Sequence, residues 1–124
     1  MLWSEGDFFI TADDWGDPRY FAVRKIDDRF PDGMVVGYLV IVKGRVSETT
    51  GWAVVQKVEV NPKYRGLGLG KALYQAALHT ISSRYRGLAS EDLNRENQLE
   101  VPKIFKSLGG IQDEFGNWFI KKPN

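Results

Sequence analysis

The sequence contains no cysteine and a single histidine, His79. Without cysteine the chain has no disulfide scaffold, no thiolate nucleophile and no cysteine-ligated zinc site. One histidine is too few for a multi-histidine metal centre, so we expect no metal site. Because cysteine-free chains are compatible with a reducing compartment, we expect a cytoplasmic protein.

Net charge and long apolar runs are also lacking. Seventeen basic and sixteen acidic residues leave a formal charge of +1. This balance argues against a general nucleic-acid binder, which needs a strongly basic face to neutralise phosphates. The longest apolar run, residues 34–42, has nine residues and is too short to cross a bilayer. The first residues, MLWSEGDFF, lack a basic region followed by an apolar core, so we expect neither a secretion signal nor a membrane anchor.

What the chain does contain is a series of strand and helix patterns in one domain, residues 1–124, with no linker or internal repeat. Runs rich in β-branched and aromatic residues predict strands over residues 7–11, 20–26, 34–43, 52–60 and 86–93. Glycine and asparagine between two short apolar runs predict a hairpin at the C-terminus, around Gly116 and Asn117.

Two helices are predicted between and after these strands. Leu69, Leu73 and Ala76 recur at helical spacing in the first. The second covers residues 99–109, with Pro102 in its first turn, where proline is tolerated. The order predicts a mixed α+β fold with a largely antiparallel sheet. Its strand–helix–strand unit should pair at least one strand in parallel.

A glycine turn precedes the first predicted helix in the segment NPKYRGLGLGKALYQAAL, residues 61–78. Gly66, Gly68 and Gly70 have GxGxG spacing, which differs from the GxGxxG of dinucleotide-binding turns. A P-loop is also excluded, because its first glycine is missing and Ala72 has no hydroxyl for magnesium. The turn still suits an anion such as a pyrophosphate, since the first helical N–H groups are unpartnered and glycine allows close approach. The alternative is an ordinary strand-to-helix turn.

The residues around this turn resemble a known motif. Arg65, Gly68 and Gly70 are similar to the acetyl-CoA-binding motif of the GNAT superfamily of N-acetyltransferases, which is Arg or Gln, two residues, Gly, one residue, then Gly or Ala. The flanking residues also match common choices of the family: Val58, Val60, Pro62, Tyr64 and Gly66. The segment VPKIFKSLGG, residues 101–110, resembles the family's later helix, and the resemblance extends from about residue 22 to the C-terminus.

This resemblance implies a GNAT-like fold that binds acetyl-CoA as a co-substrate. The strand at 52–60 would splay from the next, parallel strand, and the pantetheine arm would enter between them. The N–H groups of residues 65–71 would surround the pyrophosphate, and Asn97, or its neighbour Gln98, would contact the arm. The implied cofactor-binding residues are Val58, Glu59, Val60, Arg65, Gly66, Leu67, Gly68, Leu69, Gly70, Lys71 and Asn97.

The family's catalytic residues are not at their usual places. Gln56 and Val54 occupy the positions of the usual base, nine and eleven residues before the motif's arginine. Phe105 occupies the place of the usual tyrosine acid. Because proximity alone accelerates thioester aminolysis, these changes do not exclude catalysis. Water chains to Glu59, Glu91 or Asp92 could remove the proton, and Tyr64 or Tyr85 could serve as the acid. Among the bases we select Glu91, on the predicted strand facing the gap, although an exposed charge at a strand end is the simpler interpretation of this residue.

The acceptor side also departs from the family. About eight residues, 12–19, join the first two strand-like runs, too few for the two helices that relatives have there. We therefore expect an open acceptor side, suited to a protein or another large amine. The leading hypothesis is an acetyl-CoA-dependent N-acetyltransferase, a monomer or homodimer. The alternatives are a catalytically degenerate CoA-binding or partner-binding module, and an interaction protein whose glycine turn is vestigial.

Overall fold

The structure is a computed structural model of the chain, and it describes residues 2–13, 19–24, 33–91 and 100–123. Its centre is one sheet in which eight strands follow the order β1-β2-β3-β4-β5-β6-β8-β7. The strands are β1 (Trp3–Glu5), β2 (Phe8–Asp13), β3 (Arg19–Arg24), β4 (Met34–Lys43), β5 (Ala53–Val60), β6 (Gly87–Ser90), β7 (Ile111–Gln112) and β8 (Trp118–Lys121).

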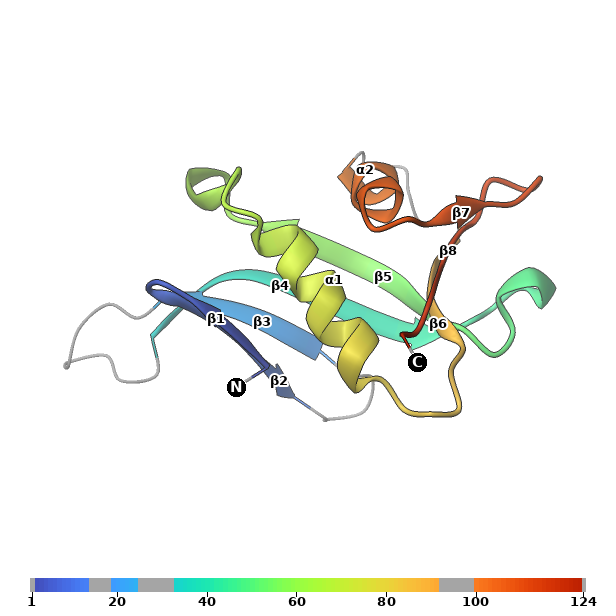
Figure 1. The fold of residues 1–124 in the computed structure, drawn as a ribbon, viewed down its shortest axis with the longest axis horizontal. Helices are drawn as coiled ribbons and strands as arrows, with labels where there is room; N and C mark the ends of the chain where they lie inside the picture. The colour runs from blue at the N-terminus through green and yellow to red at the C-terminus, as the bar shows by residue number, and fades with distance from the viewer. Residues whose placement is uncertain (1, 14–18, 25–32, 92–99, 124) are drawn as a thin grey trace.

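Two α-helices accompany this sheet. Helix α1 (Leu69–Thr80) lies across one face and packs against β2 to β6. Helix α2 (Glu100–Ser107) packs against β8, near the edge of the sheet that ends in β7 (Figure 1). Two short 3-10 turns are η1 (Ser47–Thr49), between β4 and β5, and η2 (Pro62–Tyr64), before α1.

The sheet buries apolar side chains on both faces. Ala53 and Val55 of β5 join the main core beneath α1, whereas Val54 joins a smaller cluster with Trp52 and Ala89. This alternation is the period of two that an extended strand imposes, so successive residues of β5 face opposite sides.

The strands β5 and β6 form the parallel pair of the sheet. Their register contains the pairs Ala53↔Leu88 and Val54↔Ala89 and no further pair within the described residues. Near this point the register of β4 and β5 shifts, and β5 contains one extra residue, Gln56. A bulge of this kind bends β5 and increases its twist directly after the pairs with β6.

These findings confirm the predicted fold class, including the parallel pair and the two main helices. The expectation that no two helices fit into the connection at 12–19 is not tested, because residues 14–18 lie outside the described residues. Sequence analysis missed β1 and missed η1 inside the predicted loop at 44–51. Both elements are only three residues long, too short for a periodic pattern.

Candidate functional site

The glycine turn joins the end of β5 to the start of α1. Gly66 and Gly68 have φ angles of +83° and +80°, in the left-handed region that side chains with a Cβ disfavour. A Cβ built on either residue would meet no heavy atom within 4 Å. Glycine is therefore needed here for backbone conformation rather than to avoid a neighbour, and the space beside the turn is open.

The first turn of α1 presents backbone donors to this space. Gly68 is the N-cap residue, no side chain caps the helix, and Ala72 N–H donates to the Gly68 carbonyl at 3.0 Å. The N–H groups before Ala72 precede the first intrahelical bond. No acidic residue lies in the first turn, and Lys71 and Arg65 are exposed nearby. The end of α1 thus combines unpaired donors with positive charge, which favours an anion.

Gly70 has a different role from the other two glycines. A Cβ built on it would lie 3.2 Å from Ile104 Cδ1 of α2 and 4.0 Å from Val60 Cγ2 of β5. One helical turn later, the ring of Tyr74 packs edge-on against Phe105, with centroids 5.3 Å apart. The same face of α1 therefore contacts α2 through both residues.

The remaining predicted cofactor residues are distributed around the turn. Val58 and Val60 are half-buried and pack against the main core. Glu59 is exposed and accepts a hydrogen bond from the Tyr38 hydroxyl at 2.9 Å. Leu67 is exposed and Leu69 is buried. The Arg65 side chain donates from Nε to the Val60 carbonyl at 3.1 Å. Asn97 lies outside the described residues.

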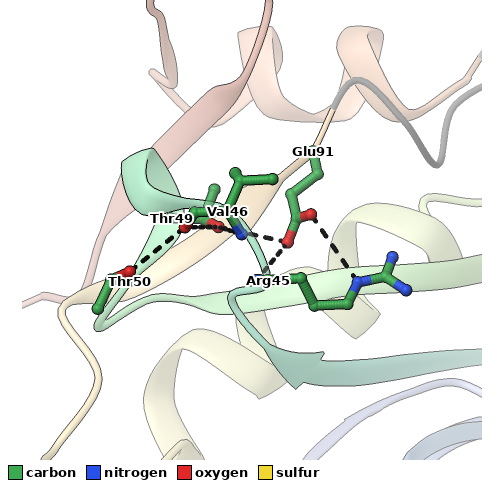
Figure 2. Close-up of polar contacts among 5 residues, drawn as sticks. All are labelled: Arg45, Val46, Thr49, Thr50 and Glu91. Carbon is green, nitrogen blue, oxygen red and sulfur yellow. Dashed lines mark hydrogen bonds and ion pairs between the residues drawn. The ribbon is translucent and has the colours of Figure 1, made fainter.

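Glu91 follows β6 directly and is buried, with a side chain that is 1% exposed. Its Oε1 accepts from the Arg45 backbone N–H at 2.9 Å and from the Thr49 hydroxyl at 3.3 Å, and Arg45 Nε lies 3.9 Å from Oε2 (Figure 2). Oε2 has no hydrogen-bond partner among the described residues. Interpreting Glu91 as an exposed charge was therefore wrong, because the loop between β4 and β5 covers it.

The position of Glu91 relates it to the usual base position of the family. Val54 and Ala89 are partners in the register of β5 and β6. Glu91 follows Ala89 by two residues, so it comes shortly after the partner of Val54, which occupies one of the two usual base positions.

Tyr64, the other predicted catalytic residue, is buried on a different side of the molecule. Its hydroxyl accepts from Arg24 Nη1 of β3 at 3.1 Å, and its ring packs edge-on against Phe8 of β2 at 6.0 Å. In the sheet, β4 and β5 lie between these strands and β6. The structure therefore does not bring Tyr64 and Glu91 together.

Sequence analysis missed Tyr74 as a candidate. This side chain is fully buried, and its hydroxyl has no hydrogen-bond partner in the described part of the chain. Burial raises the pKa of the Tyr74 phenol far above its usual value. Its spacing of four residues from Gly70 was the available signal, since residues i and i+4 share a helix face.

No group of three or more potential metal ligands occurs among the described residues. None of the described helices is long and apolar enough to cross a membrane.

Comparison with known families assigns the class of the protein. Residues 1–98 match the family described as "Acetyltransferase (GNAT) family". Because this match covers most of the chain, the chain belongs to the GNAT acetyltransferase family. No curated protein sequence matches it significantly.

Similar solved structures agree with this fold. Two are of a tyrosine-to-phenylalanine mutant of the toxin AtaT bound to the C-terminus of the antitoxin AtaR, one of them with acetyl-CoA. Each has a TM-score of 0.69, 16% identity and 94% coverage of both chains. A third, AtaTR bound with acetyl-CoA, has a TM-score of 0.60 and 18% identity and covers 86% of this chain and 68% of the other. At these identities the likeness concerns the fold.

Proposed function

We propose that this protein binds acetyl-CoA at the N-terminus of α1 and transfers the acetyl group to a primary amine. The observation that carries the proposal is the turn at Gly66 and Gly68, which is open to solvent and leads into an uncapped helix without acidic residues. Unpaired N–H groups and exposed cations there suit a pyrophosphate. The bulge of β5 at Gln56, directly after the pairs with β6, supports an entry for the thioester arm beside Val58, Glu59 and Val60.

The transfer needs a group that accepts the proton of the attacking amine. We assign this role to Glu91, directly or through a water. Its Oε1 is engaged by Arg45 and Thr49, which orient the carboxylate, while Oε2 has no partner in the described residues. Tyr64 is not part of the proposed mechanism, because Arg24 and the packing of β2 engage it on the far side of β5.

For the acceptor we infer a large amine, such as one on a protein. The support is that the described residues before Met34, which form β1 to β3, contain no helix that could enclose a small metabolite. The AtaT structures, in which the toxin binds the C-terminus of an antitoxin, are compatible with a peptide partner on this fold.

A second candidate function is a CoA-binding module without turnover. It is favoured by Val54 and Phe105, which are both fully buried core residues at the places where relatives carry a base and an acid. Glu91 distinguishes the two candidates, because only the enzyme requires a side chain there that can accept a proton.

Calorimetric titration of acetyl-CoA tests the cofactor site. The variant Gly68→Asp should weaken binding by more than tenfold, because it places a negative charge where the pyrophosphate is expected. Gly68→Asn is the matched control, since it has the same size and the same left-handed backbone cost but no charge. Equal loss in both variants, or no binding by the unmodified protein at millimolar acetyl-CoA, would contradict the proposal. Measuring the consumption of acetyl-CoA with a panel of peptide amines then distinguishes the enzyme from the CoA-binding module without turnover.

A further inference from the structure

Tyr38, Lys57 and Glu59 form a polar cluster across β4 and β5, the Tyr38 cluster. Tyr38 is the register partner of Glu59, and its hydroxyl donates to Glu59 Oε2 at 2.9 Å. Lys57 Nζ lies 3.9 Å from the same oxygen and 5.7 Å from the centroid of the Tyr38 ring. The aromatic ring and the carboxylate thus hold one primary ammonium group between them, and strand pairing fixes their relative position.

Lys57 is a weakly held occupant of this cluster. Its distance to the carboxylate is longer than a hydrogen bond, and its distance to the ring is close to the limit of about 6 Å for a cation–π contact. The side chains of Lys57 and Glu59 are 56% and 54% exposed. A cation that arrives from solvent can therefore displace Lys57 and contact the ring and the carboxylate more closely.

The Tyr38 cluster lies on the face of the sheet opposite to the main core. Val58 and Val60 pack against the main core, so Lys57 and Glu59, which alternate with them along β5, point to the other face. Helix α1 and Phe105 of α2 both contribute to the main core. The described helices therefore leave the cluster open to a large ligand.

The proposed base is reached from the same face. Val54 and Ala89 belong to the smaller apolar cluster on that face, and Glu91 follows Ala89 by two residues. Glu59 follows Val54 by five residues of β5, which corresponds to about 15 Å along a strand. An extended peptide of about five residues spans the distance from the region of Glu91 to the Tyr38 cluster.

The protonation that the cluster favours distinguishes it from the place of reaction. An amine that attacks a thioester must first lose its proton. Interactions with Tyr38, and after them the negative charge of Glu59, raise the pKa of the Lys57 ammonium above its usual value. The cluster therefore favours the charged form of a primary amine, and it suits a cation that is held without being acetylated.

We propose that Tyr38 and Glu59 bind a second cationic side chain of the acceptor, and that Lys57 occupies this subsite while no acceptor is bound. This inference rests on the proposed function. It narrows the acceptor from a large amine to a basic peptide, in which a further lysine or arginine lies about four or five positions from the acetylated amine.

The test measures the affinity of two fluorescent peptides by anisotropy, in the absence of acetyl-CoA. One peptide has two lysines separated by three glycines, and the other has norleucine, an uncharged residue of similar length, in place of the second lysine. The preference is the ratio of the two affinities. In Lys57→Met it should grow by about three- to tenfold, because the peptide no longer competes with Lys57 for the ring and the carboxylate. In Glu59→Gln it should fall below that of the unmodified protein.

Lys63→Met is the matched control. It also removes one exposed ammonium group over a tyrosine ring, since Lys63 Nζ lies 6.0 Å from the centroid of Tyr64, and it should leave the preference unchanged. Equal changes in Lys57→Met and Lys63→Met would mean that net charge alone acts, and the inference would be overturned. An unchanged preference in Lys57→Met or in Glu59→Gln would overturn it as well.

These outcomes are independent of the cofactor. The peptide measurements contain no acetyl-CoA, so a negative result there removes the cationic subsite and leaves the acetyl-CoA titration to decide the proposed function. Conversely, the expected changes in a protein that binds no acetyl-CoA would support a basic-peptide site and contradict acetyl transfer.

Discussion

The hydroxyl of Thr49 donates at 3.3 Å to the carboxylate of Glu91, which lies 42 positions further along the chain. The backbone N–H of Arg45 donates to the same oxygen at 2.9 Å. Together these bonds fasten the loop between β4 and β5 to the end of β6 (Figure 2). Glu91 therefore has a structural role in addition to the proposed catalytic one, and separate variants are needed to distinguish the two.

The structural role predicts that Thr49→Val destabilises the fold. Valine has nearly the same shape, but it leaves a buried carboxylate oxygen with one donor fewer. We expect the free energy of unfolding to fall by about 1–3 kcal/mol. Thr50→Val is the matched control, since Thr50 is exposed and should change stability by less than about 0.5 kcal/mol. Urea unfolding measures the stability of both variants. Equal losses would show that the Thr49 hydroxyl does not stabilise the contact between the β4–β5 loop and Glu91.

The catalytic role predicts that Glu91→Gln lowers kcat far more than it lowers stability. The amide oxygen can still accept from Arg45 and Thr49, but the side chain can no longer take a proton. Loss of a general base typically costs a factor of about 10² to 10⁴ in rate. Glu114→Gln, in the exposed turn between β7 and β8, should leave kcat unchanged. An active Glu91→Gln enzyme would exclude Glu91 as the base.

The local features of this fold were predictable, and the contacts between distant segments were not. The strand at β5 and the start of α1 follow from β-branched residues, Pro62 and the glycine turn, which are all close in sequence. The burial of Glu91 depends on the loop that contains Thr49, and nothing in either segment alone indicates that they meet. A carboxylate at the end of a short strand otherwise resembles a solvent-exposed charge.

Gly70 is a second residue whose contact with a distant segment could not be predicted from the sequence. Its place in the motif predicted a role in cofactor binding, and no residue near Gly70 in the sequence indicated that α2 lies against it. In the structure the nearest atom to a Cβ at this position is Ile104 Cδ1, from a helix more than thirty residues later. The contact could be known only once the packing of α2 was known, and it makes Gly70 a helix-packing residue as well.

This contact predicts an energetic coupling between Gly70 and Ile104. Alanine favours a helix over glycine by up to about 1 kcal/mol, but its Cβ would crowd Ile104 Cδ1 at 3.2 Å. Ile104→Val removes that Cδ1 atom. The double variant should therefore be more stable, by at least about 0.5 kcal/mol, than the sum of the two single changes. A double-mutant cycle in urea measures the coupling, and additivity would show that α2 does not approach Gly70 this closely.

The buried phenol of Tyr74 predicts a stability change at alkaline pH. Its pKa in the folded protein is raised above the ordinary value of 10.0, because burial disfavours the phenolate. Below pH 10 the phenol is protonated in both the folded and the unfolded chain and adds no pH dependence. Above pH 10 the unfolded chain releases a proton that the folded chain retains, so the free energy of unfolding falls by about 1.4 kcal/mol per pH unit for this group.

Tyr74→Phe removes this contribution and isolates it from the other groups that titrate in the same range. We expect the variant to be at least as stable as the unmodified protein at pH 8, because it loses only a hydroxyl that has no partner among the described residues. Its advantage should then grow by up to about 1.4 kcal/mol between pH 10 and pH 11. Tyr20→Phe should be about 1 kcal/mol less stable at pH 8, since its hydroxyl is paired with Thr80. Parallel pH profiles for the unmodified protein and Tyr74→Phe would mean that water reaches the phenol, and its burial in the core would be disproved.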